Sequence, residues 1–477
     1  MNRQSFLSEL WLPALGLLLF ATAIFCRPLL PIDETRYMSV AWEMSLHSGW
    51  LDPLTKNFEP YSHKPPLLFW LINIFWEIFG ISRWAGTIPI ILSSILCIYL
   101  TGILGQKIAN TLSKDTASSP FLNTQKIRVI MAASLPFMIY GTLIMFDFLI
   151  CVFALLSLIL ILKYADTRRI VDLVLLSICL GLGVLAKGPV AYLYVLPCYL
   201  LAPLWKENLT HLKKWYLSLL IILVISVIPV LLWLIPVLKE SDNQFAFWLV
   251  WNQTAGRVTG NFGDAHVRPF YFYFPLLPLF LMPWILFPAF WKSLPSIKSG
   301  LTKEYDLRFI FCACVPVFIA FSFISGKQPH YLVPLVPAMS LFLVWAFNKI
   351  RLKALATTLI IITSLFVMGQ FAAKHSYFDK YDLTPVVNVI HQYPDTPLAY
   401  VSNYHAEFNF LARRTSHIDD IHLENLGAWF EKHPNGLAII KYRMDSAVTQ
   451  YPMIFTMAYR GRHIGIFSKP LTQDKVK

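Results

Sequence analysis

Long apolar runs recur along this 477-residue chain, and short polar stretches separate them. Runs such as residues 10–25 and 217–238 approach the ~20 residues that a helix needs to cross a bilayer. Runs of this kind occur at about eleven or more places, which predicts an α-helical polytopic membrane protein. The predicted spans are residues 10–26, 84–105, 129–146, 148–162, 170–186, 189–205, 215–238, 270–290, 309–325, 331–347 and 354–372.

The basic residues favour one orientation of these spans. With the N-terminus in the cytoplasm, the cytoplasmic loops carry 18 Lys and Arg, whereas the opposite face of residues 1–370 carries ten. Cytoplasmic loops of membrane proteins are enriched in Lys and Arg, so this distribution supports the orientation. The formal net charge of +13 is therefore mainly an orientation signal, and we expect no nucleic-acid partner.

The loops and the C-terminal segment define the expected domains. Residues 1–372 are expected to form the transmembrane domain, with two long exterior loops at 27–83 and 239–269. Within the first loop, residues 67–79 are apolar but too few to span, which predicts a re-entrant or interfacial helix.

Residues 373–477 lack a long apolar span and are expected to form a soluble α/β domain. An amphipathic helix is predicted over residues 384–393, strands over 397–402 and 436–442, and a hairpin around Arg460 and Gly461. Because the number of spans is odd, this domain is expected in the periplasm of a bacterium, with the protein in the inner membrane.

Ionisable residues collect at the outer ends of the predicted spans. Such residues are costly near a bilayer and are often functional, so a cluster on one face predicts an anion-binding cavity edged by carboxylates. Each residue alone also fits a structural role: helix capping, a turn, or a lysine reaching the interface. The residues in question are Asp33, Glu34, Lys64, Asp147, Lys187, Arg257, Arg268 and Lys327.

Five ordered motifs then establish a family resemblance. The chain resembles the aminoarabinose transferase-like, polyprenyl-phosphate-sugar glycosyltransferases of the GT-C superfamily, which are related to the protein O-mannosyltransferases. The resemblance covers residues 5 to 370 and rests on the ordered set. The motifs are PIDETRY at 31–37 with YSHKPPL at 61–67, Asp147, AKGP at 186–189, RPFYFY at 268–273 and SGKQPHYLVP at 325–334.

The resemblance implies an inverting glycosyltransferase of the GT-C type. Its donor is a sugar on polyprenyl (undecaprenyl) phosphate, and its acceptor is lipid A or another envelope molecule at the periplasmic face. Asp33 and Asp147 match catalytic acidic positions. The residues expected to bind the donor phosphate are Lys64, Tyr61, Arg268, Arg257, Lys187, Lys327 and Tyr331, with Glu34, Arg36 and His63 in support.

The sequence leaves three points open. His63 and His266 are candidate ligands for a divalent metal ion, although hydrogen-bonded loop residues are the favoured interpretation. The aminoarabinose branch tends to carry Glu where this chain has His63, so the sugar is not identified. A secondary transporter or lipid flippase also combines many spans with buried charges, and a scaffold whose exterior domain binds a partner is a third interpretation.

Overall fold

The computed structural model describes residues 10–47, 49–207, 209, 211–241, 267–443 and 448–470. The chain forms two compact units. Unit 2 contains the C-terminal segment and, in addition, most of the first predicted exterior loop. Unit 1 comprises Met1–Phe20, Ser62–Phe75 and Thr87–Met368, and unit 2 comprises Ala21–Tyr61, Trp76–Gly86 and Gly369–Lys477.

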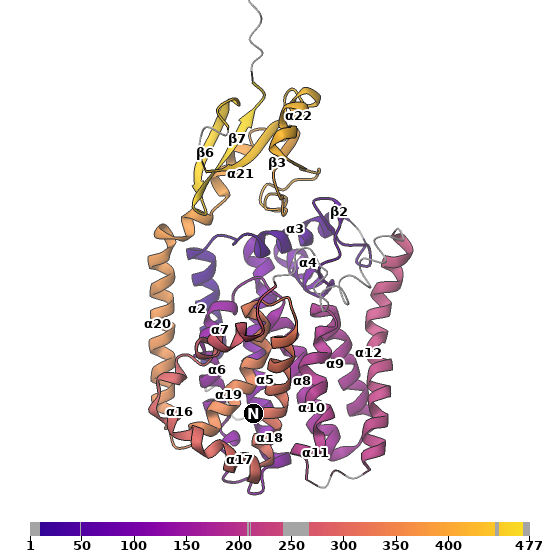
Figure 1. Cartoon of the computed structure of the whole chain (residues 1–477), viewed down its shortest axis with the longest axis vertical. Helices are drawn as coiled ribbons and strands as arrows, with labels where there is room; N and C mark the ends of the chain where they lie inside the picture. Colours follow the sequence, from indigo (N-terminus) through magenta and orange to yellow (C-terminus); the bar gives the residue numbers. More distant parts are fainter. Residues whose placement is uncertain are drawn as a thin grey trace, which may run out of the picture. The chain divides into compact units, whose positions relative to one another are not determined.

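Seven helices of the described residues are long and apolar enough to cross a membrane. Helices α8, α9 and α12 pack one against the next, and α10 packs against α18 (Figure 1). The seven are α5 (Arg83–Leu112), α8 (Asp147–Thr167), α9 (Ile170–Lys187), α12 (Leu212–Glu240), α18 (Tyr305–Phe323), η6 with α19 (Pro329–Leu335, Val336–Ala346) and α20 (Leu352–Ser376).

Shorter helices complete this part of the chain. They include the helix predicted over residues 67–79, which is confirmed as α4. The short helices are α2 (Trp11–Cys26), α4 (Leu67–Phe79), η1 (Pro120–Leu122), α6 (Thr124–Ala132), α7 (Leu135–Tyr140), α10 (Val190–Leu200), α11 (Ala202–Trp205), η3 (Phe270–Leu276), α15 (Leu277–Phe280), η4 (Trp284–Leu286), α16 (Pro288–Ser293), η5 (Leu294–Ser296) and α17 (Ile297–Lys303).

Two predicted spans are broken helices, and proline explains both breaks. Residues 129–146 fall into α6, α7 and a turn, with Pro136 in the first turn of the restarted helix α7. Residues 270–290 form four short helical pieces, each with a proline inside it or at its start. Proline lacks the N–H that continues a helix, which the apolar pattern alone does not reveal.

Small residues allow the helices of unit 1 to approach closely. A Cβ on Gly181 of α9 would lie 2.5 Å from the Ser226 carbonyl oxygen of α12. A Cβ on Gly105 of α5 would lie 2.3 Å from the Ile127 side chain of α6. Close backbone approach through small residues is typical of helices packed in a membrane.

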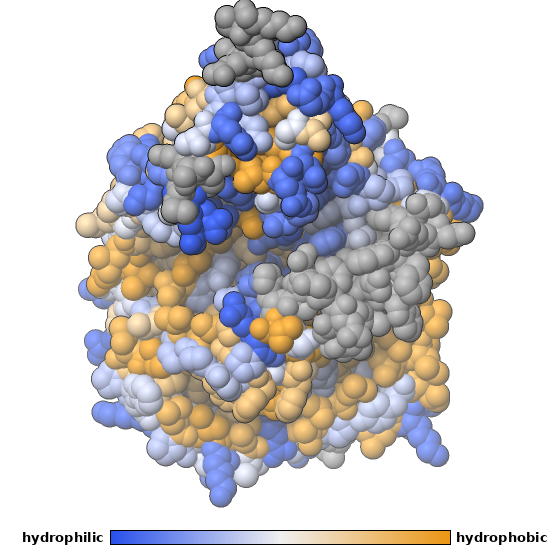
Figure 2. Space-filling model, turned by 45° about the horizontal axis from the view of Figure 1, so that its top comes forward, coloured by the Kyte–Doolittle hydropathy of each residue, from blue (hydrophilic) through white to orange (hydrophobic). Residues whose placement is uncertain are grey.

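The outer faces of α12 and α20 are apolar and exposed. Val224 and Leu232 on α12, and Ile360 and Met368 on α20, are each more than 60 % exposed. Figure 2 shows broad hydrophobic areas in orange on the surface. Water disfavours apolar surface of this extent, whereas lipid tails accept it.

Unit 2 contains a five-stranded mixed sheet of order β4-β3-β5-β7-β6. Strands β4, β3 and β5 are parallel, and β5, β7 and β6 are antiparallel. The predicted strands and the hairpin turn at Arg460 and Gly461 are confirmed. The elements are β3 (Leu398–Val401), β4 (Asp419–Ile421), β5 (Leu437–Tyr442), β6 (Met453–Tyr459), β7 (Arg462–Ser468), η7 (Phe378–Tyr381), α21 (Thr384–Ile390), η8 (Leu423–Asn425) and α22 (Leu426–Lys432).

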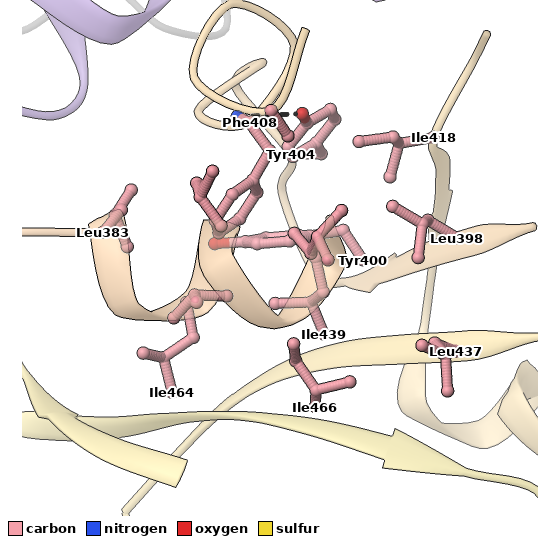
Figure 3. Close-up of a cluster of buried hydrophobic side chains, with 14 of the residues drawn as sticks. Leu383, Leu398, Tyr400, Tyr404, Phe408, Ile418, Leu437, Ile439, Ile464 and Ile466 are labelled. Atoms are coloured by element: carbon pink, nitrogen blue, oxygen red, sulfur yellow. Dashed lines mark hydrogen bonds between the residues drawn. The ribbon is translucent and has the colours of Figure 1, made fainter. Parts of the chain in front are cut away.

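Each face of this sheet packs against one helix. On β5, Leu437 and Ile439 face the cluster that includes α21, whereas Ala438 and Ile440 face the cluster that includes α22. This alternation follows from the two-residue repeat of a strand. Figure 3 shows the first cluster, in which the Phe408 backbone N–H donates to the Tyr404 hydroxyl.

The N-terminal part of unit 2 is helix α3 (Asp33–Leu46) and the small hairpin β1 (Thr55–Lys56) and β2 (Glu59–Pro60). The Ser39 hydroxyl of α3 donates to the Ala406 carbonyl oxygen at 2.7 Å. Trp42, one turn later, donates through its indole N–H to the Arg414 carbonyl oxygen at 2.8 Å. Helix α3 is therefore bonded to the C-terminal segment, more than 360 residues away in the sequence.

Candidate functional site

In unit 1, Asp147 and Lys187 form a buried ion pair. Asp147 is the first residue of α8 and Lys187 is the last residue of α9. The two helices are antiparallel neighbours, so these ends meet. Only 2 % of the Asp147 side chain and 6 % of the Lys187 side chain are exposed. Each charge also suits its helix end, because carboxylates are favoured at helix N-termini and cations at C-termini.

Aromatic residues enclose the lysine of this pair. The Lys187 ammonium lies 4.9 Å from the centre of the Tyr331 ring, a cation–π contact. The Tyr194 hydroxyl donates to the Tyr331 carbonyl oxygen at 2.7 Å, which fixes the backbone that carries the ring. The His330 ring lies edge-on to the Tyr331 ring at 4.9 Å. Neither Tyr194 nor His330 stands out in the sequence, where each is one aromatic residue among many.

Lys64 lies at the same end of α8. Its ammonium is 5.5 Å from the centre of the Phe146 ring, and Phe146 directly precedes Asp147. The Phe146 ring packs edge-on against Phe69 of α4 at 5.6 Å, and the motif of Lys64 leads into that helix. Three residues of the cluster that the sequence predicted therefore lie at one end of α8: Lys64, Asp147 and Lys187.

Lys327 and Arg268 belong to two segments that are bonded to each other. The Lys327 ammonium donates to the Arg268 carbonyl oxygen at 2.8 Å, and the Arg268 N–H donates to the Ser325 carbonyl oxygen at 3.1 Å. Burial lowers the pKa of Lys327. The Arg268 guanidinium lies over the Phe272 ring at 5.8 Å. Lys327 therefore connects the two segments through its ammonium. The Arg268 side chain takes no part in this hydrogen bond, which uses the Arg268 backbone carbonyl.

In unit 2, Asp33 and Arg36 form a second and more exposed pair. Asp33 is the first residue of α3, and its carboxylate accepts from the Arg36 guanidinium at 2.5 Å. The Asp33 side chain is 44 % exposed and that of Arg36 is 20 % exposed. A carboxylate of this kind remains accessible to another molecule while its orientation is held.

The neighbouring candidates in unit 2 are buried. The Glu34 carboxylate accepts from the Arg27 guanidinium at 3.4 Å and from the Leu30 N–H at 2.8 Å. Tyr61 is also buried, and its N–H donates to the Leu54 carbonyl oxygen at 2.7 Å. These contacts give Glu34 a structural role at the start of α3.

The described residues provide no set of ligands for the divalent metal ion that His63 and His266 were considered to bind. Among those residues, no three His, Cys, Asp or Glu side chains are grouped so as to hold a metal ion. His63 lies between Tyr61 and Lys64 and is partly buried. Arg257 and His266, both proposed from the sequence, lie outside the described residues.

Comparisons with known proteins match this fold and part of the sequence. A family model described as dolichyl-phosphate-mannose-protein mannosyltransferase matches residues 63–233. ArnT from Cupriavidus metallidurans, in a crystal structure bound to undecaprenyl phosphate, matches with a TM-score of 0.80 and 14 % identity, over 98 % of this chain and 100 % of that chain. The chain is similar in sequence to aminoarabinose transferases and has the fold of ArnT. The family resemblance seen in the five motifs is therefore confirmed.

Two further matches cover only part of the matched protein. The archaeal oligosaccharyltransferase AglB from Archaeoglobus fulgidus matches with a TM-score of 0.54 and 12 % identity, over 96 % of this chain and 74 % of that chain. Undecaprenyl phosphate-alpha-4-amino-4-deoxy-L-arabinose arabinosyl transferase 2 of Proteus mirabilis is 26 % identical over 367 residues, which are 74 % of this chain and 62 % of that protein. This chain thus spans less than two thirds of the length of such curated relatives.

Proposed function

We propose that this chain is an integral-membrane inverting glycosyltransferase that moves a sugar from a polyprenyl phosphate to a lipid A-type or other envelope acceptor. One observation carries the proposal: Lys64 and the Asp147–Lys187 pair lie at one end of α8, in a chain whose fold matches that of an undecaprenyl-phosphate-bound protein. Cations at a membrane boundary suit a lipid phosphate, and an accessible carboxylate such as that of Asp33 suits a positively charged sugar carbon.

The proposed topology has the N-terminus in the cytoplasm and an odd number of spans, about eleven. Seven long helices and the shorter apolar helices α2, α10 and Phe270–Phe280 supply candidates for them. The sheet of unit 2 then lies in the periplasm of a bacterium, and the reaction takes place at the periplasmic face of the inner membrane. The predominance of Lys and Arg in the opposite loops supports this orientation.

In the proposed reaction, the bond between the anomeric carbon and the phosphate oxygen breaks, and its electron pair leaves with polyprenyl phosphate. An oxygen of the acceptor attacks the opposite face of the sugar, so the configuration inverts. Lys64 and the Arg268 guanidinium stabilise the leaving phosphate. Lys187 holds Asp147 in place, and Lys327 positions the segment that carries Arg268.

Asp33 is proposed to act on the acceptor. Where the acceptor is a hydroxyl, Asp33 takes its proton as the new bond forms, a role typically worth ~10²–10⁴-fold in rate. Where the acceptor is a phosphate, which is already ionised, Asp33 orients the attacking group and stabilises positive charge on the sugar. Arg36 holds the carboxylate in position for either task.

Mass spectrometry of envelope glycolipids tests this proposal in cells. A deletion strain is expected to lose one sugar from lipid A or from another envelope molecule, and the mass difference identifies the sugar. The gene for the intact chain restores that mass, whereas the Asp33→Asn variant, made at equal membrane level, does not. Restoration by Asp33→Asn would contradict the catalytic role.

A further inference from the structure

The turn that carries Tyr331 lies at the start of η6, in unit 1. The Tyr331 N–H donates to the Gln328 carbonyl oxygen at 3.1 Å, which is the i+3 hydrogen bond of a 3₁₀-helix. Pro334 stands three residues after Tyr331 in the same helix. Because proline has no N–H, the i+3 hydrogen bond to the Tyr331 carbonyl oxygen cannot form. The 3₁₀ pattern therefore supplies no donor for this oxygen.

Two buried tyrosine hydroxyls from other helices bond the two ends of the turn. Tyr194 of α10 donates to the Tyr331 carbonyl oxygen at 2.7 Å. Tyr273 of η3 donates to the Gln328 carbonyl oxygen at 3.2 Å. The position of the turn is thus set jointly by α10 and η3.

Phe321 of α18 is the packing surface that these rings share. The ring centre of Tyr194 lies 5.4 Å from that of Phe321. The ring centres of Tyr331 and Tyr273 lie 5.9 Å and 6.4 Å from the same ring. Aromatic rings attract one another at these separations. A Tyr→Phe change at position 194 or 273 therefore keeps the ring packing and removes only the hydrogen bond to the turn.

The turn also determines where two groups of the proposed donor site lie. The Tyr331 ring centre is 4.9 Å from the Lys187 ammonium. Lys327 directly precedes Gln328, and its ammonium donates to the Arg268 carbonyl oxygen at 2.8 Å. A displaced turn would therefore move both the Tyr331 ring and the segment that carries Arg268.

We propose that Tyr194 and Tyr273 are positioning residues for donor binding, whose hydroxyls hold the Tyr331 ring over Lys187 before the lipid phosphate binds. The inference rests on the proposed function, and neither tyrosine has to touch the substrate. A site that is ordered in advance loses less conformational freedom on binding and so binds more tightly. Removal of either hydroxyl is expected to weaken donor binding and to leave the later steps of the reaction largely unchanged.

The first experiment follows the position of the Tyr331 ring and requires no turnover. The full-length protein, carrying ¹³Cε-labelled lysine, is placed in nanodiscs of uncharged lipid, and the Lys187 signal is assigned by its loss in Lys187→Arg. An aromatic ring shifts the NMR signals of nuclei near its face, so Tyr331→Leu gives the position of the Lys187 signal without the ring. Tyr194→Phe and Tyr273→Phe are expected to move the signal toward that position.

Tyr199→Phe is the matched control. Tyr199 is also a buried tyrosine of α10, and its hydroxyl donates to the Trp215 carbonyl oxygen at 2.8 Å, away from the turn. Its loss is expected to lower thermal stability about as much as Tyr194→Phe does and to leave the Lys187 signal in place. A Lys187 signal that does not move in Tyr194→Phe and Tyr273→Phe, or that moves equally in Tyr199→Phe, would refute the positioning role.

The second experiment measures binding of radiolabelled undecaprenyl phosphate to the same nanodiscs. Tyr194→Phe is expected to raise the Kd at least about tenfold, and Tyr273→Phe by a smaller factor because its hydrogen bond is longer. Tyr199→Phe is expected to leave the Kd unchanged. In turnover, the KM for the donor rises by the same factor at nearly constant kcat, which is the signature of lost binding that ground state and transition state share.

Failure of this inference and failure of the proposed function give different results. If the unmodified protein transfers the sugar and Tyr194→Phe does so with an unchanged KM for the donor, the positioning role alone is contradicted. If the unmodified protein binds undecaprenyl phosphate but transfers no sugar, the proposed function is contradicted. The ratio of the Kd values of Tyr194→Phe and the unmodified protein then tests the positioning role separately.

Discussion

Each unit contains a carboxylate paired with a cation, and the two pairs differ in exposure. In unit 1, Asp147 and Lys187 are almost completely buried and neutralise each other. In unit 2, Asp33 is 44 % exposed and Arg36 only orients it. A buried pair can hold geometry and charge but offers little to a substrate, whereas an exposed and oriented carboxylate can react. This difference supports a positioning role for the Asp147–Lys187 pair and the proposed role of Asp33 in the reaction.

The largest expected effect concerns the exposed pair. Asp33→Asn keeps the shape of the side chain but removes its charge, so kcat is expected to fall ~10²–10⁴-fold, while thermal stability stays within experimental error. Steady-state kinetics and thermal unfolding of the purified protein measure both quantities. Asp395→Asn, an exposed carboxylate elsewhere in unit 2, is the control and leaves kcat unchanged. Wild-type turnover by Asp33→Asn would remove Asp33 from the reaction.

Breaking the buried pair of Asp147 and Lys187 is expected to lower the free energy of unfolding. Lys187→Met leaves the Asp147 charge buried without its cation, which typically costs ~3–5 kcal/mol. The double variant Lys187→Met/Asp147→Asn is expected to recover a large part of that loss. Lys107→Met is the control, because its partner Asp166 keeps a second lysine, Lys206, at 2.8 Å. Equal losses for Lys187→Met and Lys107→Met would refute the positioning role.

A smaller effect is expected from the network that holds the turn at Asn57. Both oxygens of Glu43 accept from backbone N–H groups, so the amide nitrogen of Glu43→Gln would face a donor. An unsatisfied buried donor costs ~1–3 kcal/mol, which thermal unfolding would detect. A loss of stability too small to measure would show that the turn does not depend on Glu43.

The smallest expected effect is a pH dependence from His405. Its folded-state pKa is lowered by burial and by Arg36, Lys56 and Lys441, so the unfolded chain binds a proton that the folded chain does not. Stability therefore falls as the pH drops below 6.5 toward the folded-state pKa. His405→Gln is expected to lose this part of the dependence. Identical profiles of stability against pH for the unmodified protein and the His405→Gln variant would contradict this expectation.

Local patterns predicted much of the fold. The strands around Tyr400 and Ile439 and the hairpin at Gly461 follow from alternation and turn residues that lie close in sequence. The span predicted over 129–146 is not one helix, because hydropathy averages over the break before Pro136. No local pattern could join α3 to the segment around Ala406, since that contact links residues 367 positions apart.

The sequence singled out candidate site residues but not the bonds between them. The sequence placed Asp147 and Lys187 at one membrane boundary, yet only the packing of α8 against α9 reveals that they bond to each other. Likewise, the sequence shows Lys327 only as a further cation, and its hydrogen bond to the Arg268 carbonyl oxygen is known only from the structure. Roles depend on burial and partners, which are long-range properties of the fold.

The most direct test of the account is donor turnover by the purified protein in detergent, where no ion gradient exists. Undecaprenyl phosphate carrying a ¹³C-labelled sugar is incubated with the protein and an envelope glycolipid fraction, and the products are followed by mass spectrometry. We expect free undecaprenyl phosphate to appear together with a labelled glycolipid in equal amounts, and only when Asp33 is intact. A protein that binds the donor but releases no undecaprenyl phosphate without a gradient would contradict the account and favour a transporter.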